Sequence, residues 1–396
     1  MKYKIPFAKI ETSLKEFEYV ENVLKSGWLT TGSVAKEFED NFCKFTGAKH
    51  ALAVSSCTAA LHLALNAISI KKGDKIIVPS LTFTSSAEVI TYFQADPIFV
   101  DIDYDTCLIT PEIIQKAIDK HGDIKAVITV HFAGHPAMMT SDNQKGILDI
   151  CKENNITVIE DAAHAFPSKL NNTYVGNFGK ITCFSFYANK TITTGEGGMI
   201  VCDDEKLIEK IKIMRLHGID KDPWKRQNSV GPKWKYDVVI PGFKYNMPDI
   251  NAAIGLAQLE KAEKMRLERQ RCAEYYAKHL SEIECIEIPK LKVSFSDHSW
   301  HLYLIVVNDK SNVSRDELMD LLETDGISTS LHYIPLHQLT YYKDTYNLDN
   351  QDFPNTERYF KGCLSLPIYP SLKNEELEYI VKSIKNIVLQ NNTNKP

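Results

Sequence analysis

A lysine at position 190 stands where an aromatic-rich run meets a glycine-dense turn. The run is Cys183-Phe-Ser-Phe-Tyr-Ala-Asn-Lys190, and Thr-Ile-Thr-Thr-Gly-Glu-Gly-Gly follows it. Most lysines are solvated surface residues. A lysine between an apolar strand and such a turn is expected to lose solvent, and desolvation lowers the pKa of the amine toward the range that a nucleophile needs. Lys190 is therefore a candidate for a covalent bond to a carbonyl compound.

An acidic pair, Glu160-Asp161, follows the apolar run Ile156-Thr-Val-Ile and precedes Ala-Ala-His164-Ala. The run predicts a strand, so one carboxylate is expected at the end of that strand. An Asp in such a place often serves only to cap the next helix. The pattern by itself leaves a catalytic carboxylate and a helix cap equally open.

Two further segments carry groups that suit a flat, phosphorylated ligand. In Ala51-Leu-Ala-Val-Ser-Ser-Cys-Thr58-Ala59-Ala, a predicted strand ends in small hydroxyl residues and a helix begins directly after it. The free N–H groups and the positive dipole end of such a helix bind phosphate, although a plain Ser/Thr N-cap gives the same pattern. In Pro79-Ser-Leu-Thr-Phe83-Thr-Ser, an aromatic ring follows a strand, where it can stack on a planar ligand.

Short β-rich runs alternate with helical stretches from about residue 50 to about residue 205, which is typical of a mostly parallel sheet with helices on both faces. The predicted strands are His50–Ser55, Lys75–Val78, Ile98–Asp101, Ala126–Val130, Ile156–Glu160, Cys183–Tyr187 and Met199–Cys202. A sheet of this kind binds its ligand at the carboxyl ends of its strands. We expect one α/β domain, residues 1–250, whose seven-stranded sheet positions the segments described above.

A smaller C-terminal α+β domain is expected over residues 251–396. Residues 250–283 have apolar residues at helical spacing with Glu, Lys and Arg between them, which predicts one long helix linking the two domains. Beyond it the sequence predicts a strand, a helix, an extended piece and a final helix, at Ser299–Val307, Ser314–Thr324, Ile327–Tyr333 and Lys373–Leu389. A chain of 396 residues is long enough for two packed domains.

Composition argues against several classes of function. The net charge is −5 with both signs interspersed, which gives no basic footprint for nucleic acid. No window approaches the roughly 18 apolar residues of a membrane span, and the start, MKYKIPFAKIETSLKEF, shows no signal peptide. The nine cysteines include no Cys-x-x-Cys pair, which favours neither a zinc site nor a disulfide framework. We expect a cytoplasmic protein with no metal site, no membrane partner and no nucleic-acid partner.

Each signal is weak alone, but their order and spacing are specific. A phosphate-binding helix start, an aromatic, a strand-end Asp and a lysine about thirty residues later form the layout of fold-type-I pyridoxal 5′-phosphate (PLP) enzymes. Over nearly its whole length the chain resembles the DegT-type sugar-nucleotide aminotransferases, most closely the branch that makes UDP-4-amino-4-deoxyarabinose. The matching stretches are SGWLTTG (26–32), SSCTAALHLAL (55–65), PSLTFTS (79–85), EDAAHA (160–165), FSFYANK (184–190), TGEGG (194–198), GFKYNMPDINAAIG (242–255) and LHYIPLH (331–337).

The resemblance implies a reaction and two catalytic residues. Lys190 would bind PLP covalently and then move protons, and Asp161 would pair with the pyridine nitrogen and keep it protonated. The amino donor would be L-glutamate, with pyridoxamine phosphate as the intermediate form of the cofactor. The acceptor would be a keto sugar, with its ketone at C4, carried by a nucleotide such as UDP or dTDP. The product would serve polysaccharide, lipopolysaccharide or glycan biosynthesis.

The resemblance also implies the residues that bind the cofactor. Thr58, Ala59 and Ser185 would bind the phosphate, Phe83 would stack on the ring, and His164 would lie near the ring or the phosphate. Fold-type-I enzymes build each site from two chains, and the segment Gly242-Phe-Lys244-Tyr-Asn246 would reach the cofactor of the neighbouring subunit. We expect a homodimer in which Lys244 contacts that phosphate. Lys244 stands where the family often has Asn, and Pro167 where glycine is usual.

Three other interpretations stay open. A sugar dehydratase of the same family would carry histidine in place of the lysine, so Lys190 argues against it. An amino-acid aminotransferase commonly has a small-domain Arg that binds a carboxylate. From position 272 onward only Arg315 and Arg358 are present, neither in such a motif, although Arg215 or Arg226 could serve instead. A non-catalytic regulator would have a dispensable lysine and usually an added DNA-binding segment.

Overall fold

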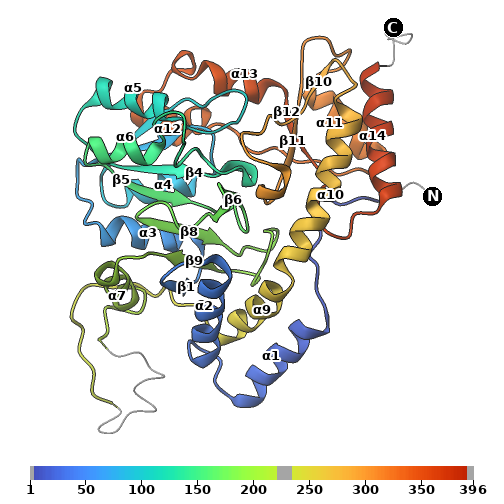
Figure 1. The fold of residues 1–396 in the computed structure, drawn as a ribbon. Coiled ribbons are helices and arrows are strands. Elements are labelled where there is room, and N and C mark those ends of the chain that lie inside the picture. The colour runs from blue at the N-terminus through green and yellow to red at the C-terminus, as the bar shows by residue number, and fades with distance from the viewer. Residues whose placement is uncertain (1–3, 221–233, 390–396) are drawn as a thin grey trace.

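A computed structural model describes residues 4–220 and 234–389 of the chain. The first unit is built around one twisted sheet (Figure 1). Its seven strands lie in the order β1 (Ala51–Val54), β9 (Gly198–Val201), β8 (Ile181–Ser185), β5 (Thr157–Asp161), β4 (Ile124–Val130), β2 (Lys75–Pro79) and β3 (Asp96–Val100). Neighbouring strands pair in parallel except at β9, which runs antiparallel to both β1 and β8. The predicted α/β fold with a mostly parallel seven-stranded sheet is confirmed.

Helices cover both faces of this sheet, because its strands are apolar on both sides. One face carries α3 (Cys57–Ala67), α4 (Ser85–Thr91) and α7 (Glu205–Met214), which pack on strand residues such as Ile159 and Ile200. The other face carries α5 (Pro111–His121) and α6 (Ile147–Glu153). At the β1–β9–β8 end of that face lie α2 (Ser33–Thr46) and α9 (Asp249–Glu260). Loops that follow the parallel strands therefore gather at one edge of the sheet.

The second unit contains an antiparallel sheet of β10 (Ile286–Glu287), β11 (Tyr303–Val307) and β12 (Cys363–Leu366). Helices α10 (Ala262–Leu280), α11 (Arg315–Thr324) and α14 (Asn374–Leu389) pack around the same apolar core. Ile5 also belongs to this core, and its backbone bonds Gly326 and Ser328. The N-terminal segment thus lies against the second unit, although the predicted boundary at residue 250 assigns it to the first.

The predicted single helix over residues 250–283 is wrong, because the structure has two helices there. α9 ends at Glu260 and α10 begins at Ala262, and between them Lys261 leaves helical geometry with φ −109°. The Lys261 ammonium lies 2.5 Å from a carboxylate oxygen of Glu16 and donates to the Glu11 carbonyl at 2.8 Å. These bonds hold the junction against the segment that contains α1 (Leu14–Ser26).

The remaining elements are short. They are the hairpin β6 (Lys169–Leu170) and β7 (Thr173–Tyr174), and the helices α12 (Thr340–Tyr346) and α13 (Pro354–Gly362). The extended piece predicted at Ile327–Tyr333 makes isolated bridges rather than a strand, from Ile327 to Ile5 and from Ser330 to Ser365. Among the helices that the structure describes, none is long and apolar enough to cross a membrane.

Candidate active site

A cavity of about 430 Å³ opens at the carboxyl edge of the large sheet. It is lined by residues that follow β1, β2, β5 and β8, together with Tyr333 from the second unit. The sequence-predicted residues that it brings together are Thr58, Phe83, Asp161, His164, Ser185 and Lys190. Ala59 and Lys244, which were predicted as well, do not line it. One cavity therefore gathers an amine, a carboxylate, hydroxyls and an aromatic ring from distant parts of the sequence.

Lys190 lies half-buried in the wall of this cavity, in the turn that follows β8. The turn is held by its backbone N–H, which donates to the Tyr187 carbonyl at 3.0 Å. Burial lowers the pKa of the Lys190 amine from 10.5 to about 8, against the opposing effect of the Asp161 carboxylate. The desolvation predicted from the flanking residues is thus present, and a substantial share of the amine is neutral near pH 8.

Asp161 ends β5 with its carboxylate held by three donors. The hydroxyl of Ser86 donates to Oδ2 at 2.7 Å, and the backbone N–H of Ala163 donates to Oδ1 at 3.1 Å. The thiol of Cys57 lies 3.9 Å from Oδ1, and burial raises its pKa well above the ordinary value, so the sulfur keeps its proton. A turn rather than a helix follows Asp161, so the helix-cap interpretation of this residue is wrong.

Glu160, the other member of the acidic pair, points away from the cavity because successive strand residues alternate between the two faces. Its buried carboxylate accepts hydrogen bonds from the Gly179 N–H at 2.7 Å and the Thr182 hydroxyl at 2.6 Å. It also accepts one from Nε2 of His131 at 2.9 Å, since Nδ1 of that ring accepts the Ala137 N–H. Glu160 therefore fixes the loop that follows β4 and leaves the cavity to Asp161.

His164 and Tyr333 form a hydrogen-bonded pair at the cavity wall. Nδ1 of His164 accepts the backbone N–H of Ala133 at 3.2 Å, which leaves the ring proton on Nε2. Nε2 then donates to the hydroxyl oxygen of Tyr333 at 3.0 Å. Burial lowers the pKa of His164 well below its ordinary value and raises that of Tyr333, so both groups are neutral. The hydroxyl proton of Tyr333 remains available to a ligand.

The sequence left two interpretations open for the start of α3, an N-cap and a phosphate-binding site. The hydroxyl of Ser56 accepts the Ala59 N–H at 3.0 Å, so that amide is used by an N-cap. Ser56 and Thr58 nevertheless line the cavity. The hydroxyl of Ser185, which also lines the cavity, accepts the Tyr187 N–H at 3.3 Å. Phe83 is 55% exposed, and its ring centroid lies 5.7 Å from that of Tyr333. The exposed ring of Phe83 is free to stack on a planar group.

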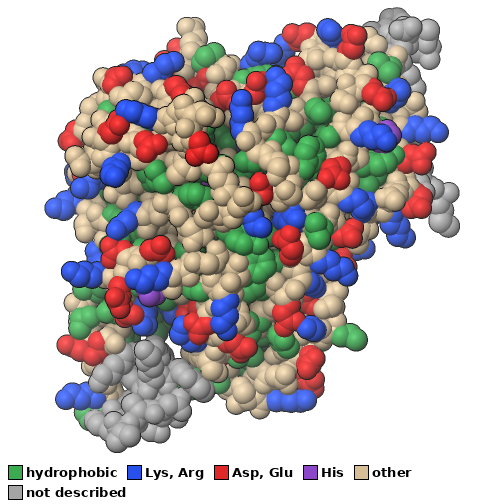
Figure 2. Space-filling view, viewed as in Figure 1, with side chains coloured by type: hydrophobic (Ala, Val, Ile, Leu, Met, Phe, Trp, Pro, Cys, Tyr) green, Lys and Arg blue, Asp and Glu red, His purple; other side chains and the backbone are tan. Residues whose placement is uncertain are grey.

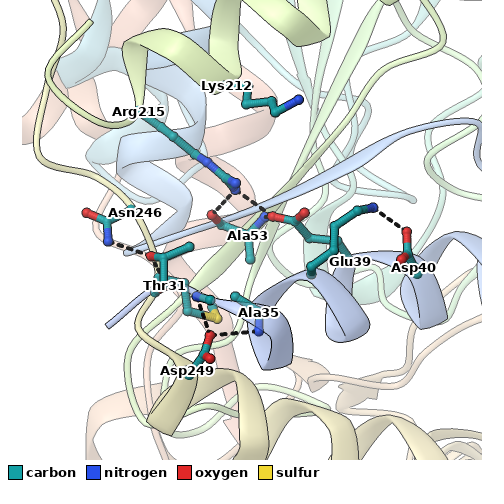
Figure 3. Close-up of polar contacts among 12 residues, drawn as sticks. Thr31, Ala35, Glu39, Asp40, Ala53, Lys212, Arg215, Asn246 and Asp249 are labelled. Carbon is teal, nitrogen blue, oxygen red and sulfur yellow. Dashed lines mark hydrogen bonds and ion pairs between the residues drawn. The ribbon is translucent and has the colours of Figure 1, made fainter. Parts of the chain in front are cut away.

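Lys244 lies outside this cavity within its own chain. Its ammonium donates to the side-chain oxygen of Asn246. The amide of Asn246 in turn donates to the Thr31 hydroxyl at 2.6 Å (Figure 3). Arg215, one candidate for a carboxylate clamp, instead binds Glu39 at 2.6 Å and the Ala53 carbonyl at 2.8 Å (Figure 3). The other candidate, Arg226, lies outside the described residues.

The small-domain arginines are also occupied elsewhere. Arg315 donates to the carbonyls of Phe360 and Cys363, and Arg358 stacks over the Tyr104 ring at 4.0 Å from its centroid. Among the residues described, no arginine lines the cavity that contains Lys190. Within the described residues, one chain therefore supplies no guanidinium to this cavity.

Three residues of the site escaped the sequence analysis. Tyr333 lies in the LHYIPLH stretch that carries the family resemblance, but the sequence alone assigns it no role. Ser86 stands one residue beyond the quoted PSLTFTS stretch, and nothing distinguishes it from any other helix serine. His301, whose Nε2 lies 3.5 Å from Nζ of Lys190, comes from the second unit and has no local signal at all.

The model of the DegT/DnrJ/EryC1/StrS aminotransferase family matches residues 11–385 of the chain. The chain belongs to this family. SpsC of Bacillus subtilis, a spore coat polysaccharide biosynthesis protein, is 39% identical over 386 residues, which cover 97% of this chain and 97% of SpsC. Spr1654 of Streptococcus pneumoniae, described as a sugar aminotransferase, is 31% identical with a TM-score of 0.87, covering 97% of this chain and 99% of its own.

Helicobacter pylori PseC, an aminotransferase involved in the biosynthesis of pseudoaminic acid, has a TM-score of 0.89 at 28% identity and covers 98% of this chain and 99% of its own. The DegT-type resemblance is therefore confirmed, and the chain is an aminotransferase of this family. Its cofactor is PLP, and Spr1654 has been solved in a PLP form and a PMP form.

The residues present fit this cofactor. A volume of about 430 Å³ lies within the range of roughly 300–1,000 Å³ that small-molecule sites occupy. Asn189 Oδ1 is buried at the cavity wall without a hydrogen-bond partner in the described part of the chain, as expected where a polar ligand is to bind. A Cβ added at Gly198 would lie 2.7 Å from the Ser56 carbonyl carbon, so glycine there lets the start of β9 pack directly on the α3 start.

Proposed function

We propose that this DegT-family enzyme transfers an amino group from L-glutamate to the keto group, at C4, of a nucleotide-linked sugar. The single observation that carries the proposal is the cavity itself. It sets the amine of Lys190 and the carboxylate of Asp161 among aromatic and hydroxyl groups, and the described residues place no arginine in its wall. Such a lining suits a large neutral sugar ring better than a second amino acid.

The roles of the two charged residues follow from their surroundings. Bound PLP supplies an electron-accepting ring that stabilises negative charge on the carbon next to the amino group. Lys190 holds the cofactor, and its amine, once free, takes the proton from the donor carbon and later returns one. Asp161 would accept a hydrogen bond from the ring nitrogen and keep that nitrogen protonated. Each unit by which Asp161 raises the pKa of the ring nitrogen corresponds to about 1.4 kcal/mol.

The remaining cavity residues would bind and orient. Thr58 and Ser185 flank the helix start where N–H groups favour a phosphate. Phe83 would stack on the cofactor ring, and its exposed position supports that role. His164 holds Tyr333, whose available hydroxyl proton can be donated to an oxygen of the sugar. Neutral donors of this kind suit a substrate that carries hydroxyl and carbonyl oxygens.

The relatives support a sugar acceptor without selecting one sugar. SpsC is named for spore coat polysaccharide biosynthesis and PseC for pseudoaminic acid, and Spr1654 is described as a sugar aminotransferase. The branch that makes UDP-4-amino-4-deoxyarabinose is therefore one hypothesis among several sugars. We place the enzyme in the cytoplasm as part of the same proposal, since nucleotide sugars are made there and its cysteines are free.

We also propose that the enzyme is a homodimer with shared sites. Within its own chain Lys244 lies outside the cavity, so a contact with the phosphate requires a second copy. A cation next to a phosphate dianion at a subunit boundary is favourable because little water screens it. Two-fold dimers are also the commonest soluble oligomers.

A substrate panel tests the reaction. Purified enzyme with glutamate is given 4-keto and 3-keto sugars linked to UDP or dTDP, and products are identified by mass. We expect amination of a 4-keto sugar and none with Lys190→Ala. Turnover of keto acids in place of sugars would identify an amino-acid aminotransferase, and release of ammonia with sugar deoxygenation would identify a dehydratase.

A further inference from the structure

His301 is the group that the second unit presents to Lys190. It stands two residues before β11, and its ring is 4% exposed. Its Nε2 lies 3.5 Å from Nζ of Lys190, which is the hydrogen-bond contact that this amine makes within the described residues. The contact is long for a hydrogen bond between two nitrogen atoms.

The imidazole of His301 is neutral. Burial, together with the charges of Lys190 and Arg269, lowers its pKa well below the ordinary value. Its other ring nitrogen, Nδ1, is buried without a hydrogen-bond partner in the described part of the chain. No other group therefore fixes its tautomer, and the amine of Lys190 can do so by donating to Nε2, with the ring proton on Nδ1.

The backbone that carries the ring is held in place from outside the cavity. The guanidinium of Arg269, in α10, donates through Nη1 to the carbonyls of Ile368 at 2.8 Å, Trp300 at 3.3 Å and His301 at 3.5 Å. Arg269 is itself only 4% exposed. On the cavity side, the ring centroid of His301 lies 4.4 Å from that of His164. Both units thus fix the position of the imidazole.

We propose that His301 is a positioning residue for Lys190, whose neutral imidazole accepts a hydrogen bond from the amine whenever that amine is free of the cofactor. The contact keeps the released amine beside the cavity instead of letting it swing away. It also makes the position of the lysine depend on the docking of the second unit. The proposal rests on Lys190 being the cofactor lysine, which is part of the proposed function.

Several other groups influence the titration of this pair. Asp161 and Cys57 face Lys190 from the end of β5 and the start of α3, whereas His164, His332 and Arg269 surround His301. None of them lies on the same element as His301. A substitution at position 301 that leaves these five residues unchanged therefore measures the effect of His301 alone.

The experiment measures the amine in cofactor-free protein. Acylation of Lys190 by a small anhydride is followed by mass spectrometry across pH, which gives the pKa of the amine without any need for turnover. In His301→Leu the ammonium loses its acceptor, so the pKa of Lys190 is expected to fall by about one pH unit. His301→Gln keeps an acceptor oxygen within reach and is expected to stay within a few tenths of wild type. His301→Asn, whose amide is too short, should resemble the leucine variant.

The matched control is His298→Leu. His298 is also buried and lies in the same segment, but its ring stacks on Trp300 rather than facing Lys190, so the acylation profile should not move. The proposal would be overturned if the acylation profile of Lys190 were the same in wild type, His301→Leu and His301→Asn. If the leucine variant does not fold, the difference between the Asn and Gln variants decides. Borohydride labelling of the PLP-loaded protein at a different lysine would refute the proposed function instead, and would leave the acylation result unchanged.

Discussion

The hydroxyl of Ser86 donates to Oδ2 of Asp161 at 2.7 Å, from the first turn of α4 to the end of β5. Ser86 is fully buried, and its oxygen also lies 2.8 Å from that of Thr82. Because α4 begins directly after the loop that carries Phe83, this bond ties the carboxylate to the same segment as the ring-stacking residue. Ser86 therefore controls the direction of the carboxylate although it need not touch the ligand.

Replacing Ser86 with alanine should misdirect that carboxylate. The variant leaves a buried carboxylate oxygen with one donor fewer, which costs about 1–3 kcal/mol. We expect the free energy of unfolding to fall by that amount and kcat to fall about tenfold, with a smaller change in KM. Thr91→Ala, at the other end of α4, serves as the control, because within the described part of the chain the Thr91 hydroxyl binds the Glu88 carbonyl and does not contact the site. Equal kinetics in Ser86→Ala and wild type would contradict this role.

Asp161→Asn keeps the shape of the side chain and removes its charge. The ring nitrogen of PLP would then lose the partner that keeps it protonated. We expect the rates of both half-reactions to fall about 100-fold or more, a loss of at least about 2.7 kcal/mol of transition-state stabilisation. Rapid-mixing measurements with glutamate and with the keto sugar separate the two halves. Wild-type rates in this variant would mean that Asp161 only stabilises the turn that follows β5.

Lys190→Met should stabilise the cofactor-free protein at neutral pH. The amine titrates at about 8 in the folded chain and at its ordinary 10.5 in the unfolded chain, so the unfolded state binds more protons between these values. Above pH 10.5 the buried amine therefore costs no stability, and the free energy of unfolding falls as the pH is lowered from 10.5 to 8. The variant should exceed wild type by about 1–3 kcal/mol at pH 7, with the gap closing above pH 8.

Urea unfolding of both cofactor-free proteins at several pH values between 7 and 9.5 measures this gap. Lys120→Met, at an exposed position in α5, controls for the loss of a lysine as such. A Lys190→Met variant no more stable than wild type at pH 7 would show that the amine is well solvated.

Arg215→Met should destabilise the chain strongly. Arg215 is 9% exposed and Glu39 is 3% exposed, so the variant leaves a buried carboxylate without its cation. We expect a loss of about 3–5 kcal/mol in the free energy of unfolding. Lys212→Met, one turn earlier in α7 and paired with the exposed Glu209, should cost less than about 1 kcal/mol. Adding Glu39→Gln to Arg215→Met should recover part of the loss, and an unchanged melting temperature in Arg215→Met would refute the argument.

Mixing inactive chains tests the contact that Lys244 is proposed to make in trans. Lys190→Ala chains and chains disabled at Lys244 are combined and allowed to exchange. A hybrid dimer then contains one site with both native residues, so part of the activity should return. Chain exchange is verified by mass spectrometry of differently tagged subunits. Absence of recovery, with exchange demonstrated and a genuine defect in the Lys244 variant, would show that the contact is not made in trans.

Much of the fold could be predicted because its strands depend on short, local stretches of sequence. All seven strands of the large sheet were expected, since a buried parallel strand reads as a short apolar run. The residues that line the cavity at strand ends, such as Asp161 and Lys190, follow from the rule that ligands bind there. The prediction that failed concerns a feature that depends on contacts with residues distant in the sequence. The break at Lys261 is held by Glu11 and Glu16, which no local pattern near residue 261 records.

The same distinction between local patterns and contacts with distant residues applies to the site. The start of α3 offered a phosphate cradle or an N-cap, and the Ser56 hydroxyl takes the Ala59 amide for the cap. Ser86 and His301 reach Asp161 and Lys190 from other elements, so only the packed structure brings them into contact. Residues that carry a charge at a strand end are visible in a sequence, whereas residues that orient them are not.

The pairing of Ile5 with residues 326–328 has a consequence for how the chain is made. The large sheet lies within residues 51–201, so it can form while the ribosome is still adding the rest. The second unit cannot close its core until helix α14 emerges, and it then has to recruit a segment that was synthesised before the large sheet. Until that moment the backbone of Gly326 and Ser328 offers an unpaired edge to other nascent chains. A fragment expressed from residue 251 onward would keep that edge open permanently.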